Sequence, residues 1–257
     1  MHDWSFDFLR RQIVGIDSAF DTPFGRRLMV YCDYTASGRC LIFFERYLQT
    51  LQRIYANTHT EDDVTGRSMS RLLHEAEAMI KRAVNAGPQG RIVACGTGAT
   101  GAIDKLQQIL GVSLAPATRR ALVDELRQFL GDERCESFLA RLLQDPKYQG
   151  RLRIGSFSAA SNVTGMRSPV HDIARLLHLH DAYACFDFAA SAPYVDIDMN
   201  PPRDPDGGDP SIDAVFLSPH KFLGGPGSSG VLVFNERLYP RDLPPSVAGG
   251  GTGDYVS

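Results

Sequence analysis

Short apolar runs that alternate with amphipathic stretches constrain the fold of this 257-residue chain more than any other feature. Runs of strand length cover residues 91–95, 152–157, 183–188, 212–217 and 231–234. Helical periodicity occupies most of the intervals between them, at about 102–110, 118–145 and 167–180. Strands that alternate with helices pair mostly in parallel, because each crossover helix returns the chain to the same end of the sheet. The pattern therefore predicts an α/β fold of three layers, in which helices cover both faces of a mostly parallel sheet.

The residues that precede the first of these runs predict further elements. Residues 5–14 have the pattern of a short amphipathic helix, and Leu28–Asp33 has that of a short strand entering a turn. Two helical patterns follow at about 38–55 and 67–86, with the polar stretch 56–63 between them.

Composition indicates one large domain with additions at its ends. The chain has 43% hydrophobic and 22% charged residues, which supplies enough apolar material for a substantial core. We expect an N-terminal helical segment at 1–28, a large domain at 29–248, and a truncated, glycine-rich link at 249–257.

Charge and cysteine content argue against several classes of function. The formal net charge of -3 gives no electrostatic reason to expect nucleic acid or an acidic membrane surface as a partner. The five cysteines are widely spaced without a C-x-x-C pair, which argues against a disulfide framework or a zinc site. His74 and Glu75 do not begin an H-E-x-x-H motif, because residue 78 is alanine, so no metal site is predicted. The lack of a leader-like N-terminus and of a membrane-length apolar stretch favours a cytoplasmic protein without a membrane partner.

Lys221 is the first candidate functional residue. It lies in the segment Ser218–Gly227, with the sequence SPHKFLGGPG, between the apolar runs that end at Leu217 and begin at Val231. A primary amine held between two buried strands suits imine chemistry, and the neighbouring serine and histidine can donate hydrogen bonds to an anion. The alternative is an ordinary solvated lysine beside a glycine-rich loop.

A glycine-rich turn is the second candidate. The sequence GTGATG at 96–101 stands between a predicted strand and a predicted helix, an arrangement that presents backbone N–H groups to a phosphate. It also matches G-x-G-x-x-G, so a Rossmann-type nucleotide-binding domain that uses Gly96–Gly101 is an alternative. Such a domain needs a second strand with an acidic end about twenty residues later, whereas residues 119–130 have a helical pattern. The turn therefore favours a phosphate cradle for another cofactor.

Two polar residues near predicted strand ends complete the set. Asp187 follows the apolar run 183–186, and a carboxylate there can pair with a pyridinium nitrogen or cap a loop. Asn162 lies in the polar stretch 156–165 between a strand and a helix, where it can hydrogen-bond a ring hydroxyl or belong to a simple loop.

Five segments carry a resemblance to a known family. In chain order they read YCDYTA at 31–36, GATGAID at 98–104, SNVTG at 161–165, DFAA at 187–190 and SPHK at 218–221. The chain resembles the fold-type I, class V aminotransferase-like enzymes, which depend on pyridoxal 5'-phosphate (PLP), and within them the cysteine desulfurase and selenocysteine lyase group. The resemblance implies the large domain of a PLP-dependent transferase.

Carried over position by position, the resemblance implies a role for each candidate. Lys221 would form a Schiff base with PLP, Asp187 would hold the pyridine nitrogen, and Asn162 would lie near the ring oxygen or the substrate. The phosphate would be held by Thr100, Ser218, His220 and the backbone of Ala99. The implied activity is desulfurase-like or lyase-like chemistry on an amino-acid substrate, in a homodimer.

Three departures from the family pattern imply an alternative. Ala190 stands where desulfurase-type members have a glutamine that donates to the ring oxygen of the cofactor. Residues 111–151 contain no histidine, although such members have a ring-stacking histidine in the corresponding interval. The smaller C-terminal domain of the family is missing beyond Ser257. The alternative is a fragment or paralogue that binds the cofactor and is impaired in catalysis.

Overall fold

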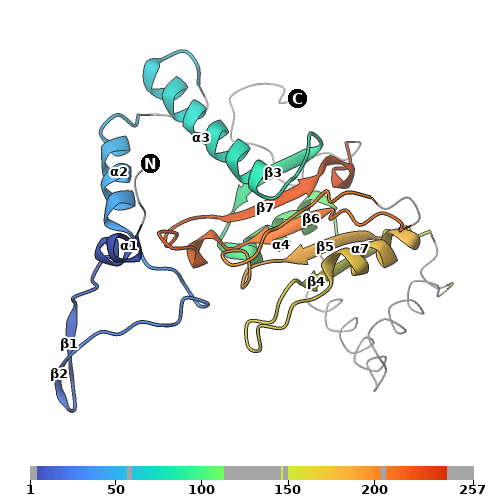
Figure 1. The fold of residues 1–257 in the computed structure, drawn as a ribbon. Coiled ribbons are helices and arrows are strands. Elements are labelled where there is room, and N and C mark those ends of the chain that lie inside the picture. Colours follow the sequence, from blue (N-terminus) through green and yellow to red (C-terminus); the bar gives the residue numbers. More distant parts are fainter. Residues whose placement is uncertain (1–4, 57–59, 113–145, 147–149, 204–206, 242–257) are drawn as a thin grey trace.

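The computed structural model describes residues 5–56, 60–112, 146, 150–203 and 207–241. Within these residues, one five-stranded sheet occupies the body of the molecule (Figure 1). A separate two-stranded hairpin projects from it in the N-terminal arm.

The main sheet has the strand order β3-β7-β6-β5-β4. Its strands are β3 (Gly90–Cys95), β4 (Ile154–Ser158), β5 (Tyr183–Asp187), β6 (Ala214–Leu217) and β7 (Gly230–Asn235). β4, β5 and β6 pair in parallel, whereas β7 is antiparallel to both β6 and β3. Four strands therefore run in one direction and β7 runs in the other. The prediction of an α/β fold around a mostly parallel sheet is confirmed.

The central strands are apolar throughout because both of their faces are covered. Along β6, Val215 and Leu217 join one buried cluster, whereas Ala214 and Phe216 join a second cluster. This alternation is the two-residue period of a strand, and all four residues are buried. A strand with only one covered face would show polar residues at every second position.

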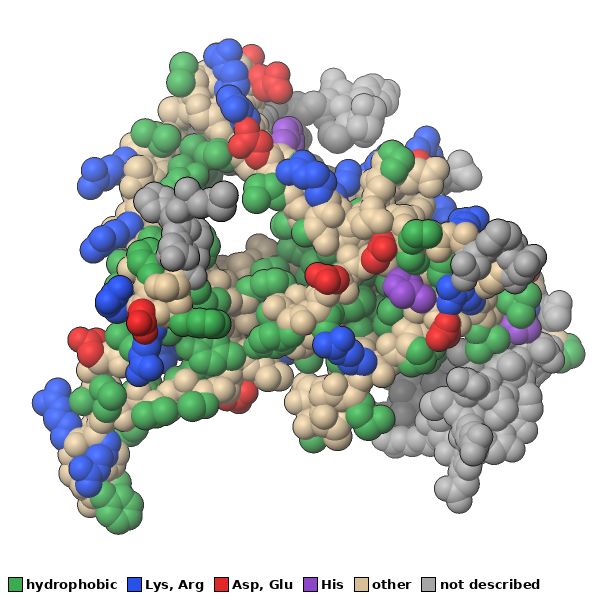
Figure 2. All heavy atoms as spheres, in the orientation of Figure 1, with side chains coloured by type: hydrophobic (Ala, Val, Ile, Leu, Met, Phe, Trp, Pro, Cys, Tyr) green, Lys and Arg blue, Asp and Glu red, His purple; other side chains and the backbone are tan. Residues whose placement is uncertain are grey.

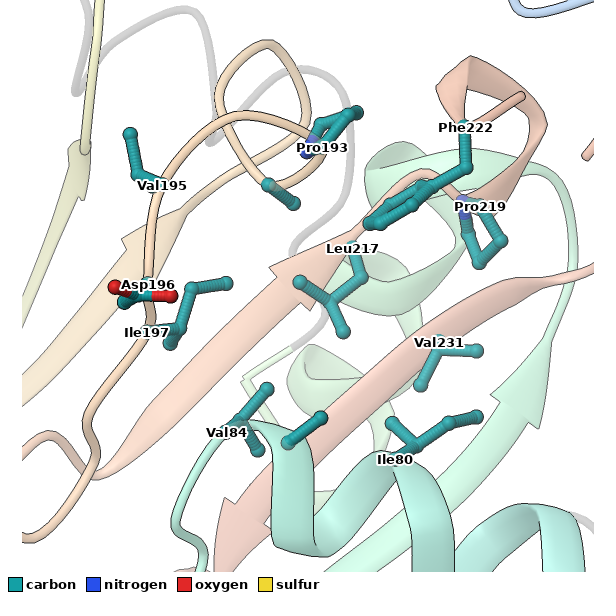
Figure 3. A pocket seen from close by; sticks show the side chains of 12 residues that line it. Ile80, Val84, Pro193, Val195, Asp196, Ile197, Leu217, Pro219, Phe222 and Val231 are labelled. Carbon is teal, nitrogen blue, oxygen red and sulfur yellow. The ribbon is translucent and has the colours of Figure 1, made fainter. Parts of the chain in front are cut away.

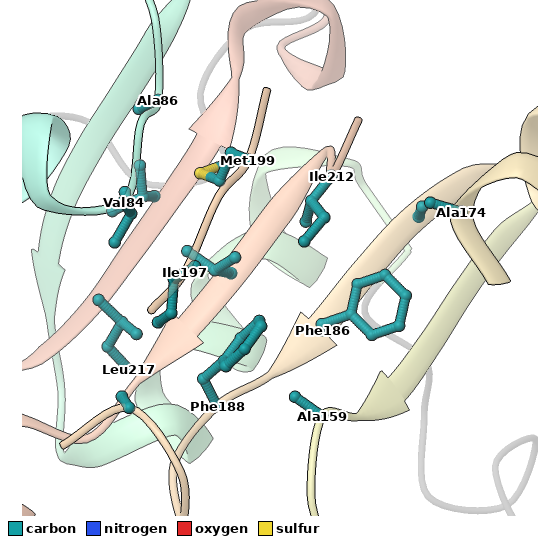
Figure 4. Close-up of a cluster of buried hydrophobic side chains, with 14 of the residues drawn as sticks. Val84, Ala86, Ala159, Ala174, Phe186, Phe188, Ile197, Met199, Ile212 and Leu217 are labelled. Atoms are coloured by element: carbon teal, nitrogen blue, oxygen red, sulfur yellow. The ribbon is translucent and has the colours of Figure 1, made fainter. Parts of the chain in front are cut away.

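Helices supply the outer layers. α3 (Val64–Ala83) and α7 (Val170–Leu179) lie on the face of the first cluster, which includes Ala174 and Leu177 of α7 (Figure 4). α4 (Gly98–Ile109) covers the opposite face, where its Ala102 and Leu106 join the second cluster. The predicted arrangement of helices on both faces is therefore present.

A buried ionic cluster ties α7 to the end of the sheet where β5 and β6 begin. The Asp213 side chain is fully buried and accepts hydrogen bonds from the Ala184 N–H at 2.8 Å, from His178 Nε2 at 2.8 Å, and from Arg237 Nε. His178 Nδ1 lies 2.9 Å from the Asp209 carbonyl oxygen, so both ring nitrogens face oxygen acceptors. Burial alone would lower the pKa of His178, but the bonds to Asp213 and Asp209 outweigh burial and raise that pKa.

The N-terminal arm contains α1 (Phe6–Gln12), the hairpin of β1 (Ala19–Thr22) and β2 (Gly25–Leu28), and α2 (Ile42–Gln52). No residue of α1 or α2 is buried, and several large apolar side chains of the arm are exposed (Figure 2). The arm therefore gains little stability from burial of its own apolar surface.

Most elements predicted from the sequence occur in the structure with shifted ends. The patterns at 5–14, 38–55 and 67–86 correspond to α1, α2 and α3. The pattern at 167–180 corresponds to α7, and the five apolar runs correspond to the five strands of the main sheet.

Two local predictions were wrong. Of the predicted strand Leu28–Asp33, only Leu28 is in a strand, because β2 ends there. Met29 adds one backbone bond to the Ser18 carbonyl oxygen, and no ladder continues beyond it. α4 begins at Gly98 instead of Ala102, because the end of the glycine turn is wound into the first helical turn.

Some expectations are not tested. The helices predicted within 118–145 and the link at 249–257 lie outside the described residues. The division into an N-terminal segment at 1–28 and a large domain at 29–248 stays a prediction.

Candidate functional site

Strand ends bring the predicted site residues to one edge of the sheet. β3, β4, β5 and β6 all end at this edge, and the antiparallel β7 begins there, since Cys95 pairs with Gly230 and Ser158 with Asp187. Each predicted residue belongs to a strand end or to the turn that follows one. Open α/β sheets bind ligands at the carboxyl ends of their strands, so the position agrees with a binding site.

The glycine turn after β3 and the segment after β6 are in direct contact. The Ala99 N–H, in the first turn of α4, donates to Ser218 Oγ at 2.8 Å, and Ser218 is buried. Gly98 has a φ of +58°, and a Cβ at this position would lie 2.8 Å from His220 Cε1 and 2.9 Å from Ser218 Oγ. Only glycine allows this approach without strain. The structure thus brings Ala99 together with Ser218 and His220, which lie 119 or more residues later in the sequence.

The N-terminal end of α4 and the side chains beside it can bind an anionic group such as a phosphate. The first-turn N–H groups of Gly98 and Thr100 have no acceptor within the helix, and the positive end of the helix dipole lies there. Ser218 Oγ accepts one hydrogen bond and keeps its own O–H to donate. His220 Nδ1 is buried and has no hydrogen-bond partner among the described residues. An orphaned buried nitrogen is costly, and a phosphate oxygen would satisfy it.

Lys221 ends the 3-10 turn Pro219–Lys221 and is half-buried. Its N–H donates to the Ser218 carbonyl oxygen at 3.0 Å, which links it to the phosphate-side residues through the backbone. No described residue forms an ion pair with the side chain.

Asp187 is the last residue of β5 and is half-buried. Its Oδ1 accepts from the Ala189 N–H at 2.7 Å, which fixes the carboxylate in an Asx turn. Oδ2 is left to accept from a ligand. The structure therefore shows the turn-capping role of this carboxylate, and its pairing with a ring nitrogen stays a prediction.

Asn162 and Thr100 are less constrained. Both are exposed, and neither side chain contacts another predicted site residue in the described part of the chain. Asn162 lies in the 161–166 turn after β4, which is closed by bonds from Ser161 N–H to the Met166 carbonyl oxygen and from Gly165 N–H to the Ser161 carbonyl oxygen. Both residues lie at the edge of the sheet where the other predicted site residues lie, but their side chains make no contact with those residues.

Backbone contacts from the N-terminal arm to the Lys221 turn are a feature that sequence reasoning missed. The Gly38 N–H donates to the His220 carbonyl oxygen at 2.9 Å, and the Gly224 N–H donates to the Arg39 carbonyl oxygen at 2.7 Å. The partners are more than 180 residues apart, and no local pattern in the sequence signals them.

An open apolar pocket of about 510 Å³ lies beside the site, on the α3 face of the sheet (Figure 3). Ile80 of α3 and Val84, just after the end of that helix, line one side, and Leu217 and Val231 line it from the strand ends. The pocket adjoins the Lys221 turn through Pro219 and Phe222 but contains none of the predicted site residues. Its lining suits apolar groups better than the anionic end of a cofactor.

Cysteines and metal ligands add no further site in the described residues. Burial raises the pKa of Cys95, at the end of β3, and strongly raises that of Cys185, so both favour the neutral thiol. No group of three or more His, Cys, Asp or Glu side chains is arranged to hold a metal ion in the part of the chain that the structure describes. None of the described helices is both long enough and apolar enough to cross a bilayer.

Comparisons with known proteins agree with the motifs. Residues 145–257, which include Asn162, Asp187 and the Ser218–Lys221 segment, match the model of the family described as aminotransferase class-V. A curated relative, described as a probable cysteine desulfurase of Halalkalibacterium halodurans, is 31% identical over 106 residues. That match covers 41% of this chain and 24% of the relative.

Solved structures of the same group share the fold. A cysteine desulfurase from Thermococcus onnurineus superposes with a TM-score of 0.68 at 15% identity, over 100% of this chain and 64% of that one. A NifS-like protein from Rickettsia africae gives a TM-score of 0.64 at 15% identity, over 87% of this chain and 62% of that one. The chain thus spans about a quarter of the curated relative and less than two thirds of either structure.

The class V aminotransferases and cysteine desulfurases are PLP-dependent, and the residues at the α4 end of the sheet fit the phosphate of that cofactor. Residues 145–257 are therefore similar in sequence to the class V aminotransferases, and at least 87% of the chain shares the fold of proteins described as a cysteine desulfurase and a NifS-like protein.

Proposed function

We propose that this chain is a PLP-binding domain that acts on an amino acid through Lys221, with cysteine desulfurase-like chemistry. The observation that carries the proposal is the contact of the α4 N-terminus with Ser218 and His220, next to a lysine whose side chain forms no ion pair with any described residue. An anion cradle and a free amine on the same rigid edge are what a phosphate-bearing aldehyde requires.

Each side chain has a defined task in this proposal. The Ser218 O–H, His220 and the first-turn N–H groups of α4 bind the phosphate. Asp187 holds the protonated ring nitrogen through its free Oδ2, since Oδ1 is engaged by the Ala189 N–H. Asn162, at the neighbouring strand end, faces the ring oxygen or the substrate.

PLP, when bound, withdraws electrons from an attached amino acid and so weakens the bonds at its Cα. The Lys221 amine anchors the cofactor before substrate arrives and afterwards can hold or release a proton at Nζ. Because Lys221 lies at the end of a short turn, its Nζ can move while its backbone stays fixed.

A second candidate is cofactor binding with impaired turnover. It is favoured by Ala190, whose methyl group cannot donate a hydrogen bond, where desulfurase-type members have glutamine. The residues that fit the phosphate do not include Ala190, so cofactor binding and turnover are separable in this site.

The strand order argues against a Rossmann-type nucleotide site at Gly96–Gly101. In the described sheet, β3 pairs only with the antiparallel β7. A dinucleotide instead binds where parallel strands diverge at a switch point in the sheet.

Trapping of the cofactor on the chain tests the proposal. The purified protein is incubated with PLP, reduced with borohydride and digested, and the added mass is located by mass spectrometry. We expect it on the peptide that contains Lys221, lost in Lys221→Ala and retained in Lys81→Ala, a control on α3. Absence of label from the parent protein, combined with retention of a nicotinamide nucleotide, would favour the Rossmann-type alternative.

Release of alanine from cysteine, with sulfide set free by an added dithiol that is oxidised to its disulfide, separates an active enzyme from a cofactor-binding chain. The proposal also includes a homodimer, a cytoplasmic location and the domain division at residue 28, which rest on the family resemblance and on the sequence. Sedimentation at several protein concentrations checks the dimer, and limited proteolysis near residue 28 checks the division.

A further inference from the structure

The segment Ser37–Leu41, between the hairpin and α2, lies against the Lys221 turn and brackets it on both sides. The Gly38 N–H binds the carbonyl oxygen of His220, the residue before Lys221, at 2.9 Å. The Arg39 carbonyl oxygen binds the N–H of Gly224, three residues after Lys221, at 2.7 Å. The backbone on either side of the lysine is therefore fixed by a segment more than 180 residues away.

Side chains reinforce the same contact. Ser37 Oγ lies 3.3 Å from the His220 carbonyl oxygen, so that oxygen has a second donor in addition to the Gly38 N–H. Tyr31 Oη donates to the Ser37 carbonyl oxygen at 3.0 Å, and Arg39 Nη2 donates to the Val14 carbonyl oxygen at 2.6 Å. These bonds anchor Ser37–Leu41 to the rest of the arm, which makes the segment a fixed support.

Gly38 is the member of this segment that admits no side chain. It is buried, and a Cβ there would overlap the Phe222 carbonyl oxygen. Since the contacting atom is backbone and not the end of a flexible side chain, the Lys221 turn would have to move to accommodate it.

We propose that Gly38 is a positioning residue for Lys221, because its N–H and its missing side chain set where the lysine backbone lies relative to Ser218 and His220. This inference rests on the proposed role of Lys221. The N-terminal arm is then part of the cofactor site, although it contributes no side chain to the predicted set.

The test compares Gly38→Ala with Gly25→Ala, a substitution in the hairpin turn of the same arm with nothing within 4 Å of the added Cβ. Amide hydrogen exchange of the peptide that spans 218–225 is measured first, on the protein without PLP. We expect exchange about tenfold faster in Gly38→Ala, unchanged exchange in the strands of the main sheet, and parent-like values in Gly25→Ala.

PLP trapping on Lys221 is measured next, as the PLP concentration that gives half-maximal label. We expect about a tenfold higher concentration for Gly38→Ala and no change for Gly25→Ala. If Gly38→Ala does not fold, Ser37→Ala replaces it, with an expected twofold to tenfold effect, about that of one lost hydrogen bond.

The outcomes separate this inference from the proposed function. If Gly38→Ala folds and its 218–225 peptide exchanges amide hydrogen at the rate of the parent protein, the segment Ser37–Leu41 does not fix the Lys221 turn. Faster exchange with an unchanged half-maximal PLP concentration overturns the positioning role, because the contact would then serve packing alone. A parent protein that takes no label on Lys221 overturns the proposed function, while the exchange result still decides the bracketing.

Discussion

Asp213→Asn should destabilise the chain by about 3 kcal/mol, because it leaves the donors around a fully buried side chain with too few acceptors. Asp213 accepts from the Ala184 N–H, His178 and Arg237 with its two oxygens. Asparagine keeps one carbonyl oxygen and puts an NH₂ group, which is a donor, where the second oxygen was. Breaking one partner of a buried ion pair costs about 3–5 kcal/mol. We expect the lower end, because the Arg237 side chain is 39% exposed and can be rehydrated.

Urea unfolding followed by circular dichroism measures this loss, and thermal unfolding gives a second estimate. A loss of about 3 kcal/mol corresponds to a decrease in Tm of about 6–12 °C for a chain of this size. Asp172→Asn is the matched control on α7, since Asp172 pairs with Arg175 but is 74% exposed. An exposed pair contributes less than about 1 kcal/mol, so the control should barely shift the unfolding midpoint.

The reasoning fails if Asp213→Asn and Asp172→Asn cost the same amount, below about 1 kcal/mol. That result would mean that water reaches the cluster and that burial does not amplify the interaction. It would also remove the physical basis for a raised pKa at His178, because the same hydrogen bonds raise it. The stability measurement and the titration of His178 therefore check each other.

Two further predictions concern His178 and Gly98. The raised pKa of His178 means that its contribution to stability is complete below pH about 6.5 and is lost as pH rises through the folded-state pKa. His178→Gln should remove this decline from urea midpoints measured across that range, and an unchanged pH profile contradicts the assignment. Gly98→Ala should cost about 2–4 kcal/mol, from a left-handed backbone and from contact with His220 and Ser218. Gly25 has a φ of +88° but nothing within 4 Å of an added Cβ, so Gly25→Ala should cost only the strain of the left-handed backbone. If urea unfolding gives the same loss of stability for both variants, the contact of residue 98 with His220 and Ser218 adds nothing to the cost.

The strands of the main sheet could be predicted from the sequence because each one is marked by a pattern in its own consecutive residues. Apolar residues at consecutive positions, as in Ala214–Leu217, occur where both faces of a strand are covered, and no distant information is needed to recognise them. The predicted strand Leu28–Asp33 failed for the opposite reason. Its residues have strand-like composition, but a strand exists only when a partner lies beside it, and pairing here ends at Leu28.

The candidate site was predictable to the extent that its residues follow strands. Asp187 and Ser218 follow predicted apolar runs, so the convergence of strand ends placed both at one edge of the sheet. The contacts between residues at that edge could not be predicted from the sequence. The approach of Gly98 to His220, and the orphaned nitrogen that results, depend on how α4 packs under β6 and β7.

Different parts of the fold position the phosphate-side residues and Lys221, which explains how cofactor binding and catalysis can separate in such a chain. The groups that fit a phosphate come from the turn after β3 and the segment after β6, and both directly follow strands of the main sheet. The backbone of Lys221 depends instead on Gly38 and Arg39, in an arm whose helices bury none of their residues. Substitutions that loosen the arm should therefore displace the lysine while the contact of Ala99 with Ser218 persists. A motif such as SPHK can consequently be intact in a chain whose lysine is misplaced, and the arm decides which case applies.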